Sequence, residues 1–295
     1  MSDTTNERLV AGHASTITVT LTDQNGEPVA AVGTVTVQVV RQDGSTVLAA
    51  GSSTTAGSDV GVYQRTLTAA QTSQLDVLTA TWTDAGDSST TTTTHAVAGG
   101  VYFTIGEARA TDTALDNRFT DGAAIAGRQD VEDEFESICN VAFVPRAARI
   151  RVDGRGTNEV LLPNPMPRRL RAVWIYSDAT TYTALTAAEV AACRFDPSGV
   201  LVRTEGKTFP EGVRNVLVDY EHGYTRPPAE IKRYAIKRLR QILTEATSAV
   251  PSRATSFQVA ETGVFRLATA GRLSTGDPDI DGALARYSMQ IPGMS

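Results

Sequence analysis

The hydrophobic pattern changes near residue 99, and this change constrains the fold more than any other feature of the chain. Before it, apolar and polar residues alternate, as with Ile17, Val19 and Leu21 in STITVTLT, and the alternation recurs in GTVTVQVV and VLTATWT. After it, two long segments carry apolar residues at helical spacing. Period-two alternation indicates half-buried strands, whereas the longer period indicates amphipathic helices. The sequence therefore predicts two differently built parts.

Residues 1–98 predict an all-β immunoglobulin-like sandwich. The alternating segments are short, and turn sequences such as DQNGEP and RQDGST separate them, as in antiparallel sandwiches of this size. The Cys…Trp…Cys pattern of antibody-type domains is missing. We expect the Thr-rich segment before residue 98 to form an edge strand, followed by a hinge at Gly99 and Gly100.

Residues 99–295 predict an α+β domain, in which helices pack with a small antiparallel β region. The chain as a whole is therefore expected to be a multidomain protein. The expected segments of the second domain are a helical region at 101–145, a β-rich region at 146–224, a main helix at 227–247, an extended arm at 248–275 and a C-terminal tail with a short helix at 276–295.

Capping residues place the starts of three helices. Thr104 and Glu107 have the spacing of a capping box. The pair of prolines in RPPAEI fixes the start of the main helix, because proline is tolerated only in the first turn. Asp277 followed by Pro278 is typical of the start of a short helix. The same DPDIDG segment partly matches a calcium loop, but Ser288 stands where that loop needs a glutamate, so capping is the better interpretation.

The negative charge of the chain is concentrated at its beginning. The net charge of −6 arises in residues 1–98, which hold nine acidic and three basic residues. The remaining residues hold 24 of each and are neutral on average. A basic patch in the second part must therefore be balanced by an acidic patch in the same part.

Two predicted helices of that second part carry opposite charges on their outward faces. We interpret these faces as surfaces through which neighbouring subunits pair, because charge complementarity sets register and orientation. Ordinary solvated faces and, for the basic helix, nucleic-acid binding are the alternatives. The subunit-interface candidates are Asp130, Glu132, Asp133 and Glu136 on the acidic helix and Lys232, Arg233, Lys237 and Arg240 on the basic helix.

The sequence contains no pattern that carries an enzyme reaction or holds a cofactor. A G-x-S-x-G motif, a P-loop and a dinucleotide-binding fingerprint are all missing. The three histidines lie far apart, and His222 is expected at the end of a strand beside Gly223. Cys139 and Cys193 are expected to be reduced core thiols. We therefore expect a protein that is not an enzyme and that binds no cofactor or metal.

An ordered set of residues in the second part resembles the head-to-tail adaptor (connector) family of tailed bacteriophages. In that family a strand ends in a Tyr-x-x-Gly turn, a proline-started helix and an extended arm follow, and the tail opens with Gly-Asp/Asn-Pro and ends in Arg-Tyr. The matching residues here are Tyr220, Gly223, Pro227, Pro228, Gly276, Pro278, Arg286 and Tyr287. The resemblance covers roughly residues 101–290, and the N-terminal sandwich lies outside it.

The resemblance implies a structural virion protein that forms a homo-oligomeric ring, commonly twelve-fold, beneath the portal at the neck of the particle. Such a ring joins capsid to tail and lets DNA pass through its lumen. Implied partners are the portal protein and the next tail-side connector, stopper or tail protein, with the capsid as a possible partner of the sandwich. The implied portal or neighbour contacts are Arg253, Arg266, Arg272, Asp277, Arg286 and Tyr287.

Two other functions compete with this interpretation. The sandwich would suit a surface adhesin or a glycan-binding module, and the basic helix would suit a nucleic-acid-binding protein. The N-terminus lacks the pattern of a secretory signal, and no apolar run is long enough to cross a bilayer, so we expect assembly in the host cytoplasm and no membrane partner.

Overall fold

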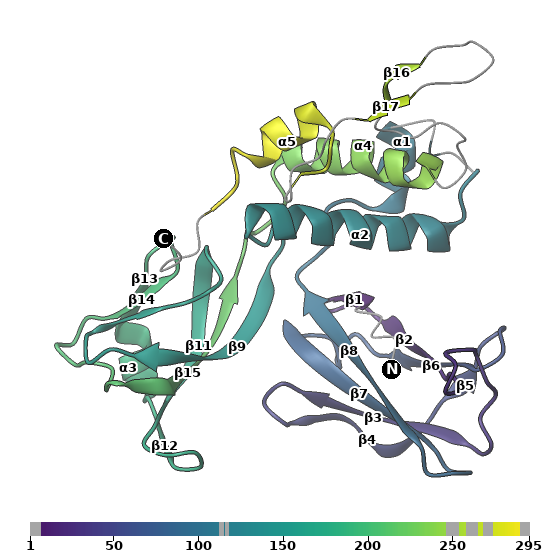
Figure 1. Cartoon of the computed structure of the whole chain (residues 1–295). Helices are drawn as coiled ribbons and strands as arrows, with labels where there is room; N and C mark the ends of the chain where they lie inside the picture. Colours follow the sequence, from purple (N-terminus) through teal and green to yellow (C-terminus); the bar gives the residue numbers. More distant parts are fainter. Residues whose placement is uncertain are drawn as a thin grey trace.

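The computed structural model describes residues 7–111, 115, 118–245, 254–257, 265–267 and 274–289, and it is a multidomain, β-dominated chain with a few helices (Figure 1). The strands are β1 (Glu7–Val10), β2 (Ser15–Thr20), β3 (Val35–Arg41), β4 (Thr46–Ser53), β5 (Thr55–Ala56), β6 (Val62–Leu67), β7 (Asp76–Asp84), β8 (Thr90–Ala98), β9 (Arg146–Gly154), β10 (Glu159–Leu161), β11 (Pro167–Tyr176), β12 (Tyr182–Ala184), β13 (Cys193–Phe195), β14 (Val200–Arg203), β15 (Gly212–His222), β16 (Ala254–Phe257) and β17 (Phe265–Leu267). The helices are α1 (Ile105–Thr111), α2 (Asp121–Cys139), α3 (Ala187–Ala192), α4 (Ala229–Glu245) and α5 (Pro278–Leu284).

The N-terminal unit, residues 7–98, consists of two sheets that share one apolar core. The larger sheet has the strand order β1-β8-β7-β3-β4 and the smaller one β2-β6-β5. Alternate residues of β2, β3 and β7 are buried, as the sequence pattern predicts, so Val37 and Trp82 of the larger sheet share a core with Ile17 of the smaller one. The all-β prediction for this part is confirmed, whereas the immunoglobulin-like class stays a prediction.

The predicted edge strand at residues 90–98 is wrong, because β8 lies inside the larger sheet. It pairs antiparallel with β7 on one side and parallel with β1 on the other. Only four residues form β1, too few for alternation to reveal a strand. The expected hinge is also a close contact: Gly99 N donates to Pro145 O at 2.8 Å, and a Cβ on Gly99 would lie 2.8 Å from the Pro145 ring.

The β-rich region packs a four-stranded sheet, ordered β12-β11-β15-β9, against a three-stranded sheet, ordered β10-β14-β13. The core between them includes Val173 and Val218 from the first sheet and Leu201 from the second. Pro163, Pro165 and Pro167 precede or begin β11, so the interior of this strand keeps the N–H groups that pair with β15.

The helical region packs α1, α2, α4 and α5 around a third core (Figure 1). The main helix begins at Ala229, and Lys232 N donates to Pro228 O at 3.0 Å, so the proline pair marks the helix start as predicted. The close approach of α2 to α4 depends on Gly127, where an added Cβ would lie 2.8 Å from Leu239 Cδ1. No helix in the described part of the chain is long and apolar enough to cross a membrane.

The predicted extended arm at 248–275 contains a short antiparallel ladder. Strands β16 and β17 pair antiparallel, with Phe257 opposite Phe265. The sequence did not predict that these two segments pair with each other. Residues 248–253, 258–264 and 268–273 lie outside the described residues.

Candidate interaction surfaces

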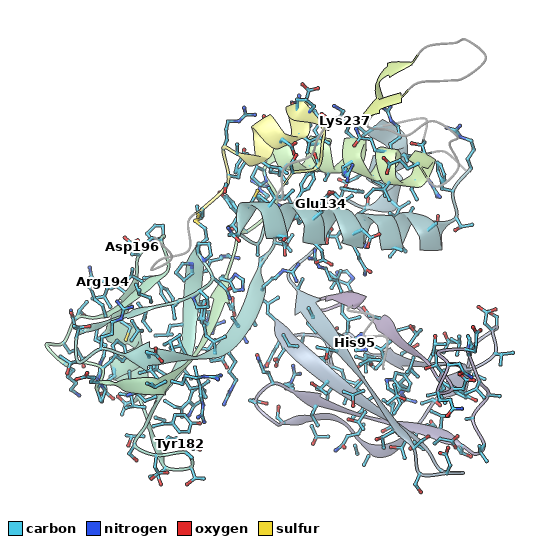
Figure 2. The ribbon with its side chains drawn as sticks, in the orientation of Figure 1. His95, Glu134, Tyr182, Arg194, Asp196 and Lys237 are labelled. Atoms are coloured by element: carbon cyan, nitrogen blue, oxygen red, sulfur yellow. The ribbon has the colours of Figure 1, made fainter. Side chains whose placement is uncertain are left out.

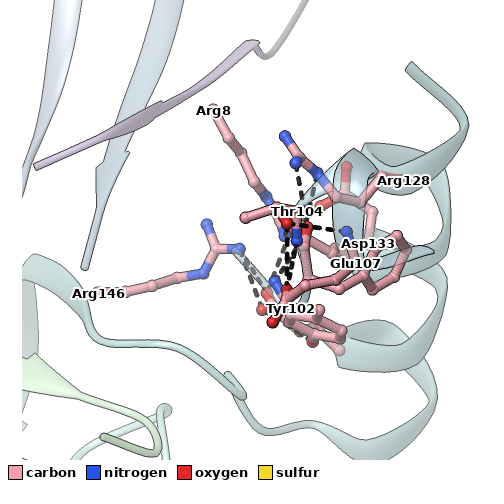
Figure 3. A network of polar contacts seen from close by, with 10 residues as sticks. Arg8, Tyr102, Thr104, Glu107, Arg128, Asp133 and Arg146 are labelled. Carbon is pink, nitrogen blue, oxygen red and sulfur yellow. Dashed lines mark hydrogen bonds and ion pairs between the residues drawn. The ribbon is translucent and has the colours of Figure 1, made fainter. Parts of the chain in front are cut away.

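The acidic face of α2 is largely occupied by the N-terminal unit of the same chain. Arg8, on β1, reaches Glu132 with its Nη1 2.5 Å from Oε2, and it also contacts Asp133 (Figure 3). Glu136 Oε2 lies 3.2 Å from Arg8 Nη2 and 2.8 Å from Arg146 Nη2. One guanidinium thus joins three of the carboxylates that the sequence assigned to a neighbouring subunit.

Burial makes this network a fixed contact rather than a solvated ion pair. The side chain of Glu132 is fully buried and that of Arg8 is only 5% exposed. Burial opposes the charge of Arg8, but Glu136, Glu132 and Asp133 together hold its pKa above the ordinary value. Tyr102 closes the network, since its backbone N–H donates to Glu132 Oε1 at 2.8 Å and its hydroxyl donates to Glu136 Oε1 at 3.2 Å. Burial raises the pKa of Tyr102 well above its usual value.

The four predicted acidic residues therefore differ in how exposed they are. Glu132 is buried and held by Arg8, so its side chain has no exposed surface for a neighbouring subunit. Glu136 also has intrachain partners but is partly exposed, and its subunit-contact role stays a prediction. Asp130 and Asp133 remain exposed, and their subunit-contact role stays a prediction. Sequence reasoning missed Arg8 and Arg146, whose positions give no sign that they lie beside this helix.

A second contact fixes the N-terminal unit against the β-rich region. Arg171 Nη1 donates to Leu75 O at 2.9 Å, and Gln42 Nε2 donates to Arg149 O at 3.2 Å. A cleft of about 380 Å³ lies between the two units here. Asp219 lines it, and burial raises the pKa of that carboxyl despite the nearby Arg171 and Arg149. The N-terminal unit thus contacts the second part of the chain at two places, α2 and the β-rich region.

The basic face of α4 is partly neutralised by acids of the same chain. Lys232 Nζ lies 2.6 Å from Glu107 Oε1 of α1. Lys237 Nζ lies 2.8 Å from Asp277 Oδ2 and 3.2 Å from Asp279 Oδ2, both at the start of α5. Burial opposes the charge of Lys237, but the two aspartates raise its pKa overall.

The other two predicted cations of α4 are exposed. Arg233 lies over the ring of Tyr234, with its guanidinium carbon 4.9 Å from the centroid, and Arg240 is on the same exposed side. Sequence reasoning missed the inward-facing Arg238, which binds Glu134 of α2 through two bonds of 2.7 and 2.8 Å. Figure 2 shows Glu134 and Lys237 on the two neighbouring helices. The subunit-contact role of the exposed cations stays a prediction.

The C-terminal tail packs onto its own chain up to Met289. Asp277 caps α5 by accepting from the N–H groups of Asp279 and Ile280, so the capping interpretation is confirmed. Arg286 pairs with Glu230, and the Tyr287 hydroxyl lies 3.4 Å from the same carboxylate.

The remaining portal-contact candidates cannot be placed in the same way. Arg253 and Arg272 lie outside the described residues, and Arg266 belongs to β17, where only the backbone is described. The portal-contact role of all six candidates stays a prediction.

Aromatic rings bring distant parts of the sequence together beside this tail. Phe143 stacks on Tyr224 at 5.6 Å between ring centroids and meets Tyr287 edge-on at 5.9 Å. Tyr102 also meets Phe143 edge-on, at 5.8 Å between ring centroids. Edge-on and stacked pairs at such distances are favourable beyond the area they bury.

The histidines and cysteines form no reactive constellation within the described ranges. No group of three or more potential metal ligands occurs there. Cys139 and Cys193 are both free thiols, and burial raises the pKa of Cys139 to about 12. His222 ends β15 beside Gly223, as predicted, and burial together with nearby Arg146 lowers its pKa to about 4.

Comparison with known proteins gives structural likenesses only. No family model matches the chain, and no curated protein matches it. Among solved structures, a chain of the neck of an empty gene transfer agent (GTA) particle, computed with C6 symmetry, is 13% identical with a TM-score of 0.46, covering 65% of this chain and 92% of that chain.

Two further structures are similar to this chain. A chain of the virion of a native GTA particle is 12% identical with a TM-score of 0.43, covering 65% of this chain and 92% of that chain. A chain of the neck of a native GTA particle, computed with C12 symmetry, is 14% identical with a TM-score of 0.42, covering 67% and 98%.

Proposed function

We propose that this chain is a structural virion protein that forms a ring beneath the portal, joins capsid to tail and lets DNA pass. The observation that carries the proposal is the convergence of three of the residues that resemble the adaptor family. Although spread over the last third of the sequence, Gly223, Arg286 and Tyr287 meet at one junction, where β15 ends, α4 begins and the tail returns.

The geometry of this junction explains why position 223 requires a glycine. Gly223 has a φ of +92°, and a Cβ there would lie 2.7 Å from the carbonyl oxygens of Ala142 and Val144. Glycine alone tolerates both conditions. The next residue, Tyr224, donates its N–H to Ala142 O at 2.9 Å and contacts Tyr287 with its ring. Gly223, Arg286 and Tyr287 thus belong to one local structure, which supports the resemblance and the adaptor function it implies.

Charge placement is compatible with a closed ring. In a cyclic assembly each subunit presents one surface to a different surface of its neighbour. Residues 1–98 carry the entire net charge of −6, while the exposed cations Arg233 and Arg240 lie on α4. Complementary charges on separate faces favour such a head-to-tail contact and set its register.

The proposed partners follow from the same assembly: further copies of this chain, the portal protein and the next tail-side protein, with the capsid a candidate for the N-terminal unit. DNA would pass through the lumen only transiently. Dense positive charge on the lumen would bind phosphates through counterion release, so Arg233 and Arg240 are better placed between subunits.

The test is the assembly state of the purified full chain, alone and mixed with the portal protein of its own particle. Light scattering and negative-stain imaging should show rings with a central opening that bind the portal. Arg233→Glu with Arg240→Glu should weaken ring formation, whereas Arg65→Glu, on the N-terminal unit, should not. A chain that stays monomeric and does not bind the portal would refute the proposal. Salt-sensitive binding to duplex DNA by the monomer would favour a nucleic-acid-binding protein instead.

A further inference from the structure

Exposed apolar side chains gather at one end of the N-terminal unit. Six large apolar side chains are exposed among the described residues, and three of them are Val29, Val32 and Val60, at 44%, 76% and 65% exposure. They lie on the loops at the end of the unit that is distant from α2, where the β7–β8 turn is found (Figure 1). We call residues 21–33, 57–61 and 85–89 the distal tip.

The three loops of the distal tip lie against one another, so the valines share one surface. Leu21 N donates to Gly61 O and Val29 N donates to Leu21 O, both at 2.9 Å, which brings the first loop beside the second. A Cβ on Gly33 would lie 2.5 Å from Gly86 N, which places the end of the first loop against the β7–β8 turn.

Buried hydrogen bonds hold the most exposed valine in place. The Asp84 carboxylate, only 4% exposed, accepts from the backbone N–H groups of Val32 at 2.7 Å, Gly33 at 2.8 Å and Gly86 at 2.8 Å. These bonds, that of Gly86 foremost, keep the pKa of Asp84 below its usual value. Ala31 N also donates to the Tyr63 hydroxyl at 3.0 Å. A loop held in this way loses little conformational entropy on binding a partner.

The apolar surface of the distal tip is surrounded by negative charge. Its three loops contain the exposed carboxylates Asp23, Glu27, Asp59 and Asp87 and contain no lysine or arginine. Two such tips would repel each other, so a second copy of the same tip is a poor occupant. A surface with the opposite charge at its edge is complementary.

From these observations we infer that the distal tip is a docking surface for another protein, one that presents apolar side chains edged by lysine or arginine. Contiguous exposed apolar surface with a polar rim marks interaction sites on soluble proteins. The inference goes beyond ring formation, because it depends only on the loops of the N-terminal unit.

The experiment selects ligands for the full-length chain from a displayed random peptide library. Peptides that also bind the variant Val29→Asp/Val32→Asp/Val60→Asp are removed. We expect the selected peptides to combine large apolar residues with arginine or lysine. A synthetic copy of one should bind the wild-type chain at least about tenfold more tightly than the Val32→Asp chain, as for a central contact of an interface. Its affinity should fall with added salt.

Two matched variants separate the tip from general surface effects. Val213→Asp changes an equally exposed valine, 84% exposed, in the β-rich region and should bind the peptide like the wild type. Glu27→Lys with Asp59→Lys keeps the valines and should weaken binding of the cationic peptide. Because all six substituted positions are exposed, each variant should unfold at the wild-type temperature.

Three outcomes would overturn the inference. The first is that no peptide distinguishes the wild type from the triple variant, and the second is that the selected peptides lack basic residues. The third is that the triple variant loses self-association, which would make the tip a contact between copies. A triple variant that still forms rings but no longer binds the peptide supports the inference and leaves the proposed function standing.

Discussion

Arg8 of β1 lies against the fully buried carboxylate of Glu132 in α2, with 2.5 Å between Nη1 and Oε2. The two residues are far apart in sequence and belong to the N-terminal unit and to the helical region. Because β1 also pairs along β8, the Arg8 side chain fastens the edge of a sheet to a helix of the second part. The N-terminal unit is therefore held in one orientation.

We expect Arg8→Ala to lower the free energy of unfolding by about 3 kcal/mol. Removing one partner of a buried ion pair leaves an uncompensated charge, which is far more costly than losing a surface pair. Arg128 remains 3.8 Å from Glu132 and compensates only partly. Urea denaturation of the full chain measures the effect.

The control is Arg65→Ala, which removes exposed bonds to Ser53 O at 3.0 Å and Ser53 Oγ at 3.4 Å. It should change stability by less than about 1 kcal/mol, roughly the value of a surface contact. Combining Arg8→Ala with Glu132→Gln should cost less than the sum of the single changes, because the two residues are coupled. Equal costs for Arg8→Ala and Arg65→Ala would show that the network does not hold the units together.

Sequence patterns predicted the helices and strands of this fold better than they predicted which of them pack against one another. The alternation around Val37 and Trp82 and the proline pair before Ala229 report local geometry, and the structure confirms both. Arg8 could not be paired with Glu132 in the same way, because the pairing depends on how two separate units pack. The sequence shows which residues are charged, but the packing of the folded chain determines which charged residues pair.

The same limit explains the errors at the boundary between the two parts of the chain. A strand becomes an edge or an inner strand according to what lies beside it, and β1 is too short to be recognised. Gly99 belongs to a Gly-Gly pair, which is typical of a hinge. Its contact with Pro145 forms only when the chain folds, so the sequence does not reveal it. The distal tip was missed because Val29, Val32 and Val60 belong to no periodic segment.

Gly223→Ala should be strongly destabilising, by about 3 kcal/mol. The substitution adds the cost of a left-handed backbone, about 1–2 kcal/mol, to a clash with the carbonyl oxygens of Ala142 and Val144. Gly206→Ala is the matched control, since its φ is +72° but nothing lies within 4 Å of the added Cβ. It should cost about 1 kcal/mol. Similar costs at both positions would contradict the close approach at Gly223.

Stability should fall between pH 6.5 and about pH 5 because of His222. Burial lowers the pKa of its folded-state imidazole to about 4, below its ordinary value of 6.5. As the pH falls through 6.5, the unfolded chain therefore binds a proton that the folded chain does not. Linkage gives a loss of about 1.5 kcal/mol over this interval.

Urea denaturation at several pH values tests the role of His222. His222→Gln should remove this part of the pH dependence, while His13→Gln, at an exposed position, should leave it in place. If the two variants show the same slope of stability against pH, His222 is not the group responsible.

Leu284→Ala tests whether the C-terminal tail belongs to the core of the chain in solution. Leu284 is fully buried, the Cys139 thiol lies 3.5 Å from its carbonyl oxygen, and Met289 N donates to Cys139 O at 2.9 Å. Truncating a buried leucine to alanine should cost about 3 kcal/mol through lost burial and the cavity left behind.

The thiol of Cys139 reports directly on the same contact. In a Cys193→Ala background, Cys139 should react slowly with a thiol reagent, because burial raises its pKa to about 12 and α5 covers it. Leu284→Ala should speed the reaction about tenfold or more by opening the tail. Asp279→Ala changes an exposed residue of the same helix and should react like the parent chain. Rapid labelling of the parent chain would mean that the tail is detached in solution and free to reach another protein before assembly.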